Sequence, residues 1–102
     1  MMESMLNIGA RVIKQEAKGL QALAAKLDSR FVEAVELLDC KGKIVLTGVG
    51  KSGHVCRKIA ATMTSLGQPA IYIHPTEAAH GDMALVDSRD ALLVLSRSGK
   101  AE

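Results

Sequence analysis

The spacing of apolar residues predicts two helices in the first part of the chain. Between residues 3 and 27, apolar side chains recur mostly at steps of three, four and seven, which places them on one face of a helix. Asp28 and Ser29 then fit a helix N-cap, because a side-chain oxygen there can accept the free N–H groups of a first turn. A second helix with the same spacing continues through Leu38, and we expect Gly42 to stop it.

Beyond this point, short apolar runs alternate with helical spacing. The runs are KIVLT (43–47), PAIYI (69–73) and ALLVL (91–95). The first is rich in branched residues and apolar throughout, which is typical of a strand covered on both faces of a sheet. Helical spacing over 54–66, closed by Gly67 as the C′ residue, separates the first two runs, and a short helical turn over 75–81 follows the second. The alternation predicts an α/β fold in which N-terminal helices precede a parallel sheet.

The chain reaches its last residue soon after the third predicted strand. A three-stranded parallel sheet is small, and one face or edge of it would lack cover, so we expect an incomplete domain or an obligate oligomer. An exposed edge strand and an apolar face favour pairing with a second copy. The long N-terminal helix is the expected partner-binding element.

Composition narrows the class of protein. Apolar residues make up 48% of the 102 residues and aromatic residues only 2%, so the core is expected to be aliphatic. The net charge is +2, and the 13 Lys and Arg residues are scattered, which argues against a nucleic-acid surface. No signal-peptide core and no apolar run long enough for a membrane span occur. We therefore expect a cytoplasmic protein without a nucleic-acid or membrane partner.

The glycine-rich segment TGVGKSGHV (47–55) follows the first predicted strand and suggests a loop around an anion. A P-loop is one reading, but its pattern requires a glycine where Val45 stands. A dinucleotide-binding fingerprint is another, since the glycines match G-x-G-x-x-G between a strand and a helix. That fingerprint needs an acid at the end of the second strand, where His74 stands instead, and the first acid is Glu77.

A third reading is a loop that binds a sugar phosphate. Lys51 supplies a charge, Ser52 supplies a hydroxyl, and the following helix presents free N–H groups at the positive end of its dipole. A second loop, SRSG (96–99), follows the third strand with two more hydroxyls. Because loops after parallel strands open on the same side of a sheet, these loops and HPTEAAHGD (74–82) are expected to face one crevice.

A metal site is the remaining alternative for the polar residues of that crevice. His74, Glu77, His80 and Asp82 are ligand types, but their spacing matches no fixed tetrahedral pattern. We therefore predict no metal. The two cysteines, Cys40 and Cys56, also lack metal-ligand spacing, and we expect reduced thiols.

The segment GVGKSGHVCRKIAATMTSLGQPAIYIHPTEAAHGDMALV (48–86) resembles the sugar isomerase (SIS) domain, and specifically the arabinose-5-phosphate isomerases. The motifs GKSGH, RK-A-T, HP-EA-HGD and S-SG carry the resemblance, which spans essentially the whole chain and is least distinctive at the start. It implies a three-layer α/β/α SIS fold, truncated after the third strand, with N-terminal helices in 1–40 and the first part of the sheet in 41–102. It also implies interconversion of D-arabinose 5-phosphate and D-ribulose 5-phosphate through an enediol, without a cofactor, on the route to lipopolysaccharide. The assembly that it implies is a dimer or a tetramer.

The same resemblance implies roles for individual residues. It makes Lys51 and His80 the catalytic positions, and the predicted substrate-binding positions are Gly50, Ser52, Gly53, His74, Ser96, Ser98 and Gly99. The chain departs from the family where Lys100 and Ala101 replace an acid and a threonine, and the family glutamates fall beyond Glu102. We therefore expect the 102 residues to be inactive alone. A non-catalytic module that senses a sugar phosphate is the alternative.

Overall fold

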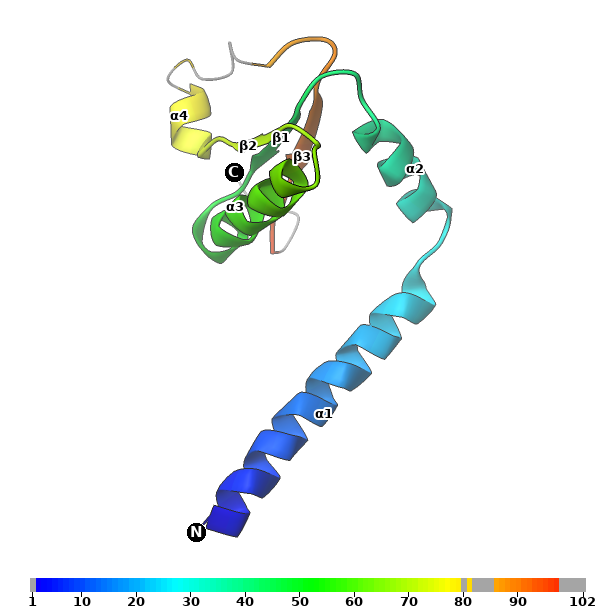
Figure 1. Cartoon of the computed structure of the whole chain (residues 1–102), viewed down its shortest axis with the longest axis vertical. Helices are drawn as coiled ribbons and strands as arrows, with labels where there is room; N and C mark the ends of the chain where they lie inside the picture. Colours follow the sequence, from blue (N-terminus) through cyan, green and yellow to red (C-terminus); the bar gives the residue numbers. More distant parts are fainter. Residues whose placement is uncertain (1, 80, 82–85, 98–102) are drawn as a thin grey trace. The chain divides into compact units, whose positions relative to one another are not determined.

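The computed structural model describes residues 2–79, 81 and 86–97, with side chains from residue 4 onward. Its elements, in chain order (Figure 1), are α1 (Met2–Lys26), α2 (Ser29–Leu38), β1 (Ile44–Thr47), α3 (Gly50–Ser65), β2 (Ala70–Tyr72), α4 (Pro75–Ala79) and β3 (Ala91–Val94). The predicted fold class, helices followed by a parallel sheet with flanking helices, is confirmed. The chain divides into two compact units, Met1–Glu33 and Ala34–Glu102, which are described separately.

The first unit holds α1 and the beginning of α2. Asp28 caps α2, since its carboxylate accepts a hydrogen bond from the backbone N–H of Arg30 at 3.0 Å. The Arg30 guanidinium also donates to this carboxylate at 2.7 Å. This bond, and after it the bond from the backbone N–H, lowers the pKa of Asp28 below its ordinary value. The predicted cap is confirmed at Asp28. None of the helices in the described part of the chain is both long and apolar enough to cross a membrane.

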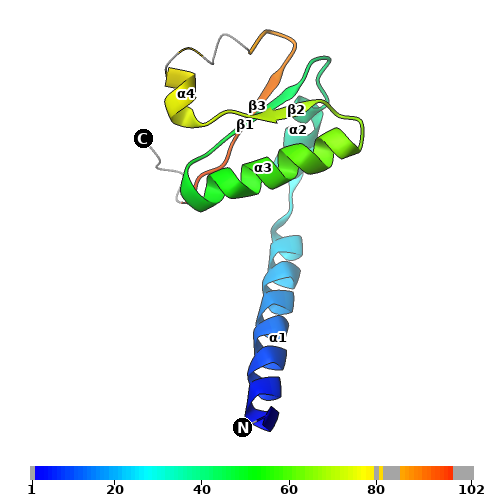
Figure 2. The same cartoon turned by 60° about the vertical axis from the view of Figure 1, so that its left-hand side comes forward.

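The sheet of the second unit has the strand order β2-β1-β3, and both pairs are parallel. Its central strand is the best buried, with Leu46 fully buried and Val45 1% exposed. On one face, Ile44 and Leu46 pack against Cys56 and Ala60 of α3, which lies along the sheet in both ribbon views (Figure 1, Figure 2). An aliphatic core of this kind is what the shortage of aromatic residues predicts.

Helix α3 ends as its sequence predicts. Gly67 has a φ of 93°, a left-handed value that glycine adopts without strain. Its N–H donates to the Thr64 carbonyl at 3.0 Å, and the N–H of Gln68 donates to the Met63 carbonyl at 2.9 Å. This pair of bonds is a Schellman motif, which satisfies carbonyls that the helix leaves free.

Gly42 does not end the second helix, which stops at Leu38. Its N–H instead donates to the Arg89 carbonyl at 2.9 Å, at the start of the neighbouring strand β3. A Cβ atom at this position would lie 2.9 Å from that carbonyl oxygen and would overlap the Asp90 carboxylate. Glycine is therefore needed for the close approach of two chain segments, and the predicted role as a helix stop is wrong.

Asp90 joins the beginnings of β1 and β3 and makes the fold sensitive to acid. Its side chain is 2% exposed and accepts bonds from the Lys43 ammonium at 2.7 Å, the Lys43 N–H at 2.9 Å and the Asp87 N–H at 3.0 Å. The Lys43 ammonium and then these backbone donors lower the pKa of Asp90 from 3.8 to about 2. A depressed native pKa stabilises the fold above pH 3.8, and this contribution disappears as the pH falls towards 2.

We expect Asp90→Asn to lower the urea midpoint of the second unit at neutral pH, and we expect the difference from wild type to shrink between pH 3.8 and 2. Tyr72 fluorescence measures this midpoint, since Tyr72 is the single tyrosine and lies in β2. Asp28→Asn is the control, because asparagine also caps helices and position 28 lies in the other unit. A pH-independent difference at position 90 would contradict the ionic role.

Candidate functional site

The loops that follow β1 and β3 meet at the carboxyl edge of the sheet. The N–H of Leu95 donates to the Thr47 carbonyl at 3.0 Å, so the two strands stay paired to their ends. Gly48 follows β1 directly and is buried, and a Cβ atom there would lie 2.8 Å from the Leu95 carbonyl oxygen. The absence of a side chain at position 48 therefore lets the chain after β3 lie against the glycine-rich loop.

Helix α3 begins inside the glycine-rich segment. Gly50 is its first residue and has a φ of 59°, while Val49 before it makes no side-chain cap. Lys51 and Ser52 thus lie in the first turn of a helix, where N–H groups lack intrahelical acceptors and the helix dipole is positive. The first turn of α3 also contains no acidic residue, so the local charge stays positive.

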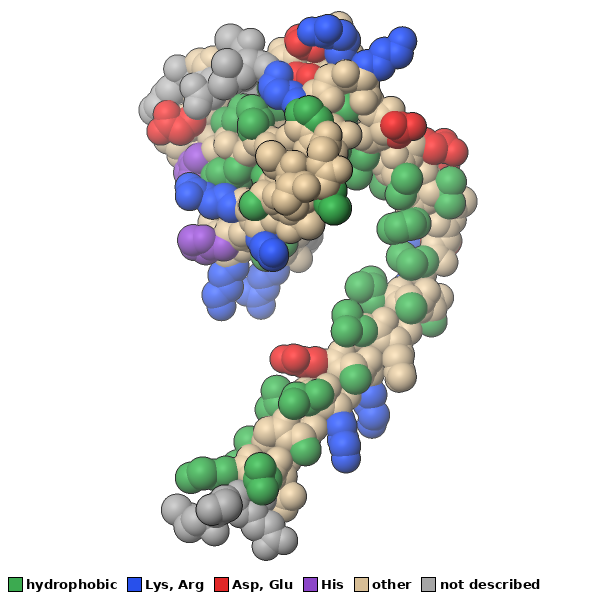
Figure 3. Space-filling view, in the orientation of Figure 1, with side chains coloured by type: hydrophobic (Ala, Val, Ile, Leu, Met, Phe, Trp, Pro, Cys, Tyr) green, Lys and Arg blue, Asp and Glu red, His purple; other side chains and the backbone are tan. Residues whose placement is uncertain are grey.

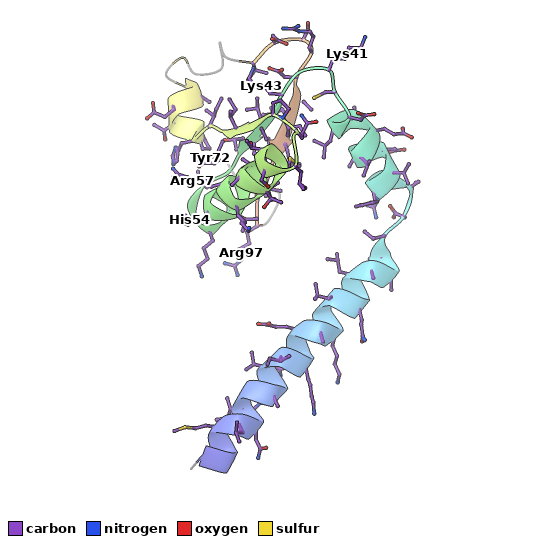
Figure 4. All side chains as sticks on the ribbon, in the orientation of Figure 1. Lys41, Lys43, His54, Arg57, Tyr72 and Arg97 are labelled. Atoms are coloured by element: carbon purple, nitrogen blue, oxygen red, sulfur yellow. The ribbon has the colours of Figure 1, made fainter. Side chains whose placement is uncertain are left out.

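A cavity of about 380 Å³ lies between this first turn and the chain after β3. It is lined by Lys51, Ser52, Val55, Leu95, Ser96 and Arg97. Figure 4 shows Arg97 at the N-terminal end of α3, where Lys, Arg and His side chains gather on the surface in Figure 3. Neither Lys51 nor Arg97 forms an ion pair with any residue that the structure describes. The two cations are therefore available to an anionic ligand.

Tyr72 of β2 is hydrogen-bonded to the glycine-rich segment in which α3 begins. Its hydroxyl donates to the Gly48 carbonyl at 2.7 Å, and the Arg57 guanidinium of α3 lies 4.9 Å from the centre of its ring (Figure 4). Gly53 lies against both partners of this hydrogen bond, because a Cβ atom there would be 2.7 Å from the Gly48 oxygen and 2.8 Å from the Tyr72 hydroxyl. The first turn of α3 is thus fixed against both β1 and β2.

We expect Tyr72→Phe to weaken anion binding and to cost about 1 kcal/mol of stability, because the Gly48 carbonyl loses its hydrogen bond while the ring is retained. Urea unfolding and ligand titration measure the two effects. Arg57→Gln is the matched control, since it removes the cation over the ring and keeps the hydroxyl bond. If both substitutions had the same effect, the hydroxyl would have no separate positioning role.

The structure brings together only part of the predicted site. Lys51, Ser52 and Ser96 line one cavity, and Gly50 and Gly53 shape the backbone beside it. His74 does not line this cavity. Its Nδ1 accepts the Thr76 N–H at 3.0 Å at the beginning of α4, which leaves the proton of the neutral ring on Nε2. The predicted positions His80, Ser98 and Gly99, and Asp82 of the metal alternative, lie outside the described residues.

Two residues of this region were missed by the sequence analysis. Arg97 stands between the serines of SRSG, and its charge next to a predicted phosphate loop was the available signal. Tyr72 is the only polar side chain of the run PAIYI and stands near its carboxyl end. A lone hydroxyl in an apolar strand needs a hydrogen-bond partner when it is partly buried, and here the partner is the Gly48 carbonyl of the glycine-rich segment.

Comparisons with known proteins show what the chain is similar to. The model of the SIS domain matches residues 36–102. The arabinose 5-phosphate isomerase GutQ of Escherichia coli K12 is 45% identical over the whole chain, and KdsD of Pseudomonas aeruginosa is 48% identical over 87% of it. The chain spans 32% and 28% of the lengths of these two relatives. The solved structure of c3406 of E. coli CFT073 in complex with arabinose 5-phosphate matches 96% of this chain and 53% of its own, with a TM-score of 0.86 and 35% identity.

Proposed function

Since the chain belongs to the SIS domain family, we propose that it binds a sugar phosphate with the phosphate group in the cavity between α3 and the chain after β3. The observation that carries this proposal is the convergence of Lys51 and Arg97 on one cavity, which has no carboxylate among the lining residues that the structure describes. A phosphate monoester carries close to two negative charges at neutral pH, which matches the two cations.

The neighbouring groups suit the same ligand. The Arg97 guanidinium can donate two parallel hydrogen bonds to phosphate oxygens, whereas the Lys51 ammonium acts as a compact charge. The Ser52 hydroxyl and the N–H groups of the first turn of α3 are further donors of the kind that holds an anion. A dinucleotide is disfavoured, because the acid that would bind its ribose is absent from the end of β2.

We propose that the reaction at this site is the interconversion of D-arabinose 5-phosphate and D-ribulose 5-phosphate. In the aldose-to-ketose direction a base removes the proton at C2, the C–H electron pair forms the C1=C2 double bond, and the C1=O π pair moves onto O1, which is protonated to give the enediol. The 2-hydroxyl then loses its proton as C2 becomes the carbonyl, and the C1=C2 pair takes up a proton at C1. The positive charge of Lys51, which favours binding of the anionic substrate, would also contribute to the field that stabilises the negative charge developing on the enediolate oxygen. The names of the relatives and the sugar-phosphate complex of the solved structure support this choice of ligand.

A module that binds a sugar phosphate without turnover is the second candidate. One observation favours it: among the described residues, those that line the cavity include no carboxylate and no imidazole, the usual carriers of a proton between adjacent carbons. Binding of arabinose 5-phosphate without its conversion by the 102-residue chain would support this reading. Conversion by the same chain would contradict it and would also overturn the expectation that these residues are inactive alone.

The proposal also covers the domain organisation, the cellular location and the assembly of the protein. We propose one partial SIS domain over residues 1–102, in which 1–40 form N-terminal helices and 41–102 form the first part of the sheet. We also propose a cytoplasmic protein that works in lipopolysaccharide synthesis and assembles as a dimer or a tetramer. The alternation of helices and parallel strands supports the proposed domain, and the exposed apolar residues on α1 support the proposed assembly.

Arg97→Gln tests the proposed site. We expect it to raise the Kd for arabinose 5-phosphate about tenfold or more, because a charged donor to the phosphate is lost. Calorimetric titration with arabinose 5-phosphate and with unphosphorylated arabinose measures the effect, and the second sugar should not bind in either protein. Arg89→Gln is the matched control, since Arg89 lies in the turn before β3 and pairs with Asp87 at 3.4 Å. Equal losses in both variants would mean that only the overall charge matters.

A further inference from the structure

The proposed phosphate cavity is polar towards the edge of the sheet and apolar further in. Among the described residues that line it, those with a charge or a hydroxyl are Lys51, Ser52, Ser96 and Arg97. The other lining residues, Val55 and Leu95, are aliphatic. Because α3 connects two parallel strands, it runs back along the sheet, so the step from Ser52 to Val55 leads away from the carboxyl edge. Val55 and Leu95 thus form the apolar floor of the cavity.

Both residues of the apolar floor are held by the elements that carry them. Val55 follows Lys51 and Ser52 by four and three positions on α3, so the three side chains share one side of the helix. Leu95 continues β3, since its N–H donates to the Thr47 carbonyl at 3.0 Å, and it packs against the hydrophobic core. Val55 remains 50% exposed, although an aliphatic side chain gains from cover. A ligand in the cavity therefore meets a fixed apolar surface beside the donors.

Free phosphate fits this division of the cavity poorly. Each of its oxygens seeks a hydrogen bond, and the oxygen that faces the apolar floor loses water without finding a partner. A phosphate monoester has its ester oxygen in that place, which carries no charge and is joined to carbon. In a pentose 5-phosphate this carbon is C5, a CH2 group without a hydroxyl, and its burial against the floor is favourable. The polar groups then hold the terminal oxygens of the phosphate.

We infer that Val55 determines specificity for a phosphate monoester over inorganic phosphate, by packing against the carbon that bears the phosphate group. Leu95 forms the other part of this contact, whereas Lys51 and Arg97 act on ester and free phosphate alike, because both anions are negatively charged. Val55 takes no part in proton transfer, because its side chain has no group that ionises. The inference rests on the proposed function and deepens it, since it names the part of the ligand that the apolar floor recognises.

Methyl phosphate tests the inference, because it adds a single carbon to phosphate at the ester position. Chemical-shift titration of the 102-residue chain measures binding of methyl phosphate and of inorganic phosphate at alkaline pH, where the two anions carry nearly equal charge. We expect wild type to bind methyl phosphate roughly threefold to fivefold more tightly, the effect of covering one CH2-sized group.

Val55→Ala removes the apolar contact and keeps the cations. We expect it to bring the affinities for the two small anions together and to raise the Kd for arabinose 5-phosphate roughly threefold to tenfold. The Kd for inorganic phosphate should stay unchanged. Val35→Ala is the matched control, because Val35 is also 50% exposed on a helix and does not line the cavity. Circular dichroism checks that each variant keeps its fold.

Three results would overturn the inference while wild type still binds arabinose 5-phosphate, so that the proposed function stands. One is equal affinity of wild type for methyl phosphate and inorganic phosphate. Another is unaltered affinity of Val55→Ala for arabinose 5-phosphate, which decides the matter even if the small anions bind too weakly to be compared. The third is an equal loss in Val55→Ala and Val35→Ala. Failure of wild type to bind arabinose 5-phosphate would overturn the proposed function and this inference together.

Discussion

The Gly53→Ala variant is expected to lose about 1–3 kcal/mol of stability, the usual cost of forcing an extra carbon into a packed site. The new Cβ atom would lie 2.7 Å from the Gly48 carbonyl oxygen and 2.8 Å from the Tyr72 hydroxyl. The Tyr72 hydroxyl donates a hydrogen bond of 2.7 Å to this Gly48 carbonyl oxygen, so neither atom can move without weakening the hydrogen bond. Relief of the clash requires α3 to move away from the loop, which also displaces Lys51 and Ser52.

Urea unfolding followed by Tyr72 fluorescence measures this loss in the unit that contains the change. Gly9→Ala is the matched control, because nothing lies within 4 Å of a Cβ atom there and alanine favours a helix by about 0.5–1 kcal/mol over glycine. We also expect Gly53→Ala to weaken binding of arabinose 5-phosphate more than its loss of stability alone explains. A variant with wild-type stability and affinity would show that α3 does not depend on contact at Gly53.

The second large effect concerns Lys51. Lys51→Met keeps the length of the side chain and removes its charge, and we expect it to cut isomerase turnover by roughly 10²-fold or more, the usual loss when a preorganised electrostatic stabiliser is removed. Turnover is measured in a chimera that carries this chain in place of the matching segment of an arabinose 5-phosphate isomerase. In the 102-residue chain itself, the measurable effect is a weaker affinity for the sugar phosphate.

Lys58→Met is the control for this experiment, since Lys58 lies on α3, is exposed and does not line the cavity. We expect Lys51→Met to leave the urea midpoint nearly unchanged, because an exposed lysine without an ion pair among the described residues adds little to stability. Unaltered kinetics in the Lys51→Met chimera would show that the glycine-rich segment is only a turn and a helix cap.

The features that the sequence predicted well depend on neighbouring residues. The cap at Asp28, the end of α3 at Gly67 and the three strands follow from local patterns of a few residues. The start of α3 was predicted less accurately, because helical spacing begins at residue 54 whereas the helix begins at Gly50. Glycine has a low helix propensity, and here contact of Gly53 with Gly48 outweighs that propensity.

The features that the sequence did not predict depend on residues far apart in the chain. Tyr72 reaches Gly48 across 24 positions, and Gly42 makes room for Asp90, so neither role follows from spacing alone. Arg97 was passed over because the serines on both sides of it already matched a phosphate loop. Its importance becomes visible once the fold brings Arg97 and Lys51 to the lining of one cavity.

The two parallel pairings of β1 also differ in how much chain must be closed to make them. Ile44 pairs with Ala70, 26 residues on, and with Ala91, 47 residues on. The longer closure costs about 0.5 kcal/mol more in chain entropy, and β3 is an edge strand with Leu92 and Val94 about half exposed. Strand β3 is therefore expected to join last during folding and to open first. Because Ser96 and Arg97 follow β3 directly, the proposed anion site forms only in molecules in which β3 is paired with β1, and a bound sugar phosphate would favour that pairing.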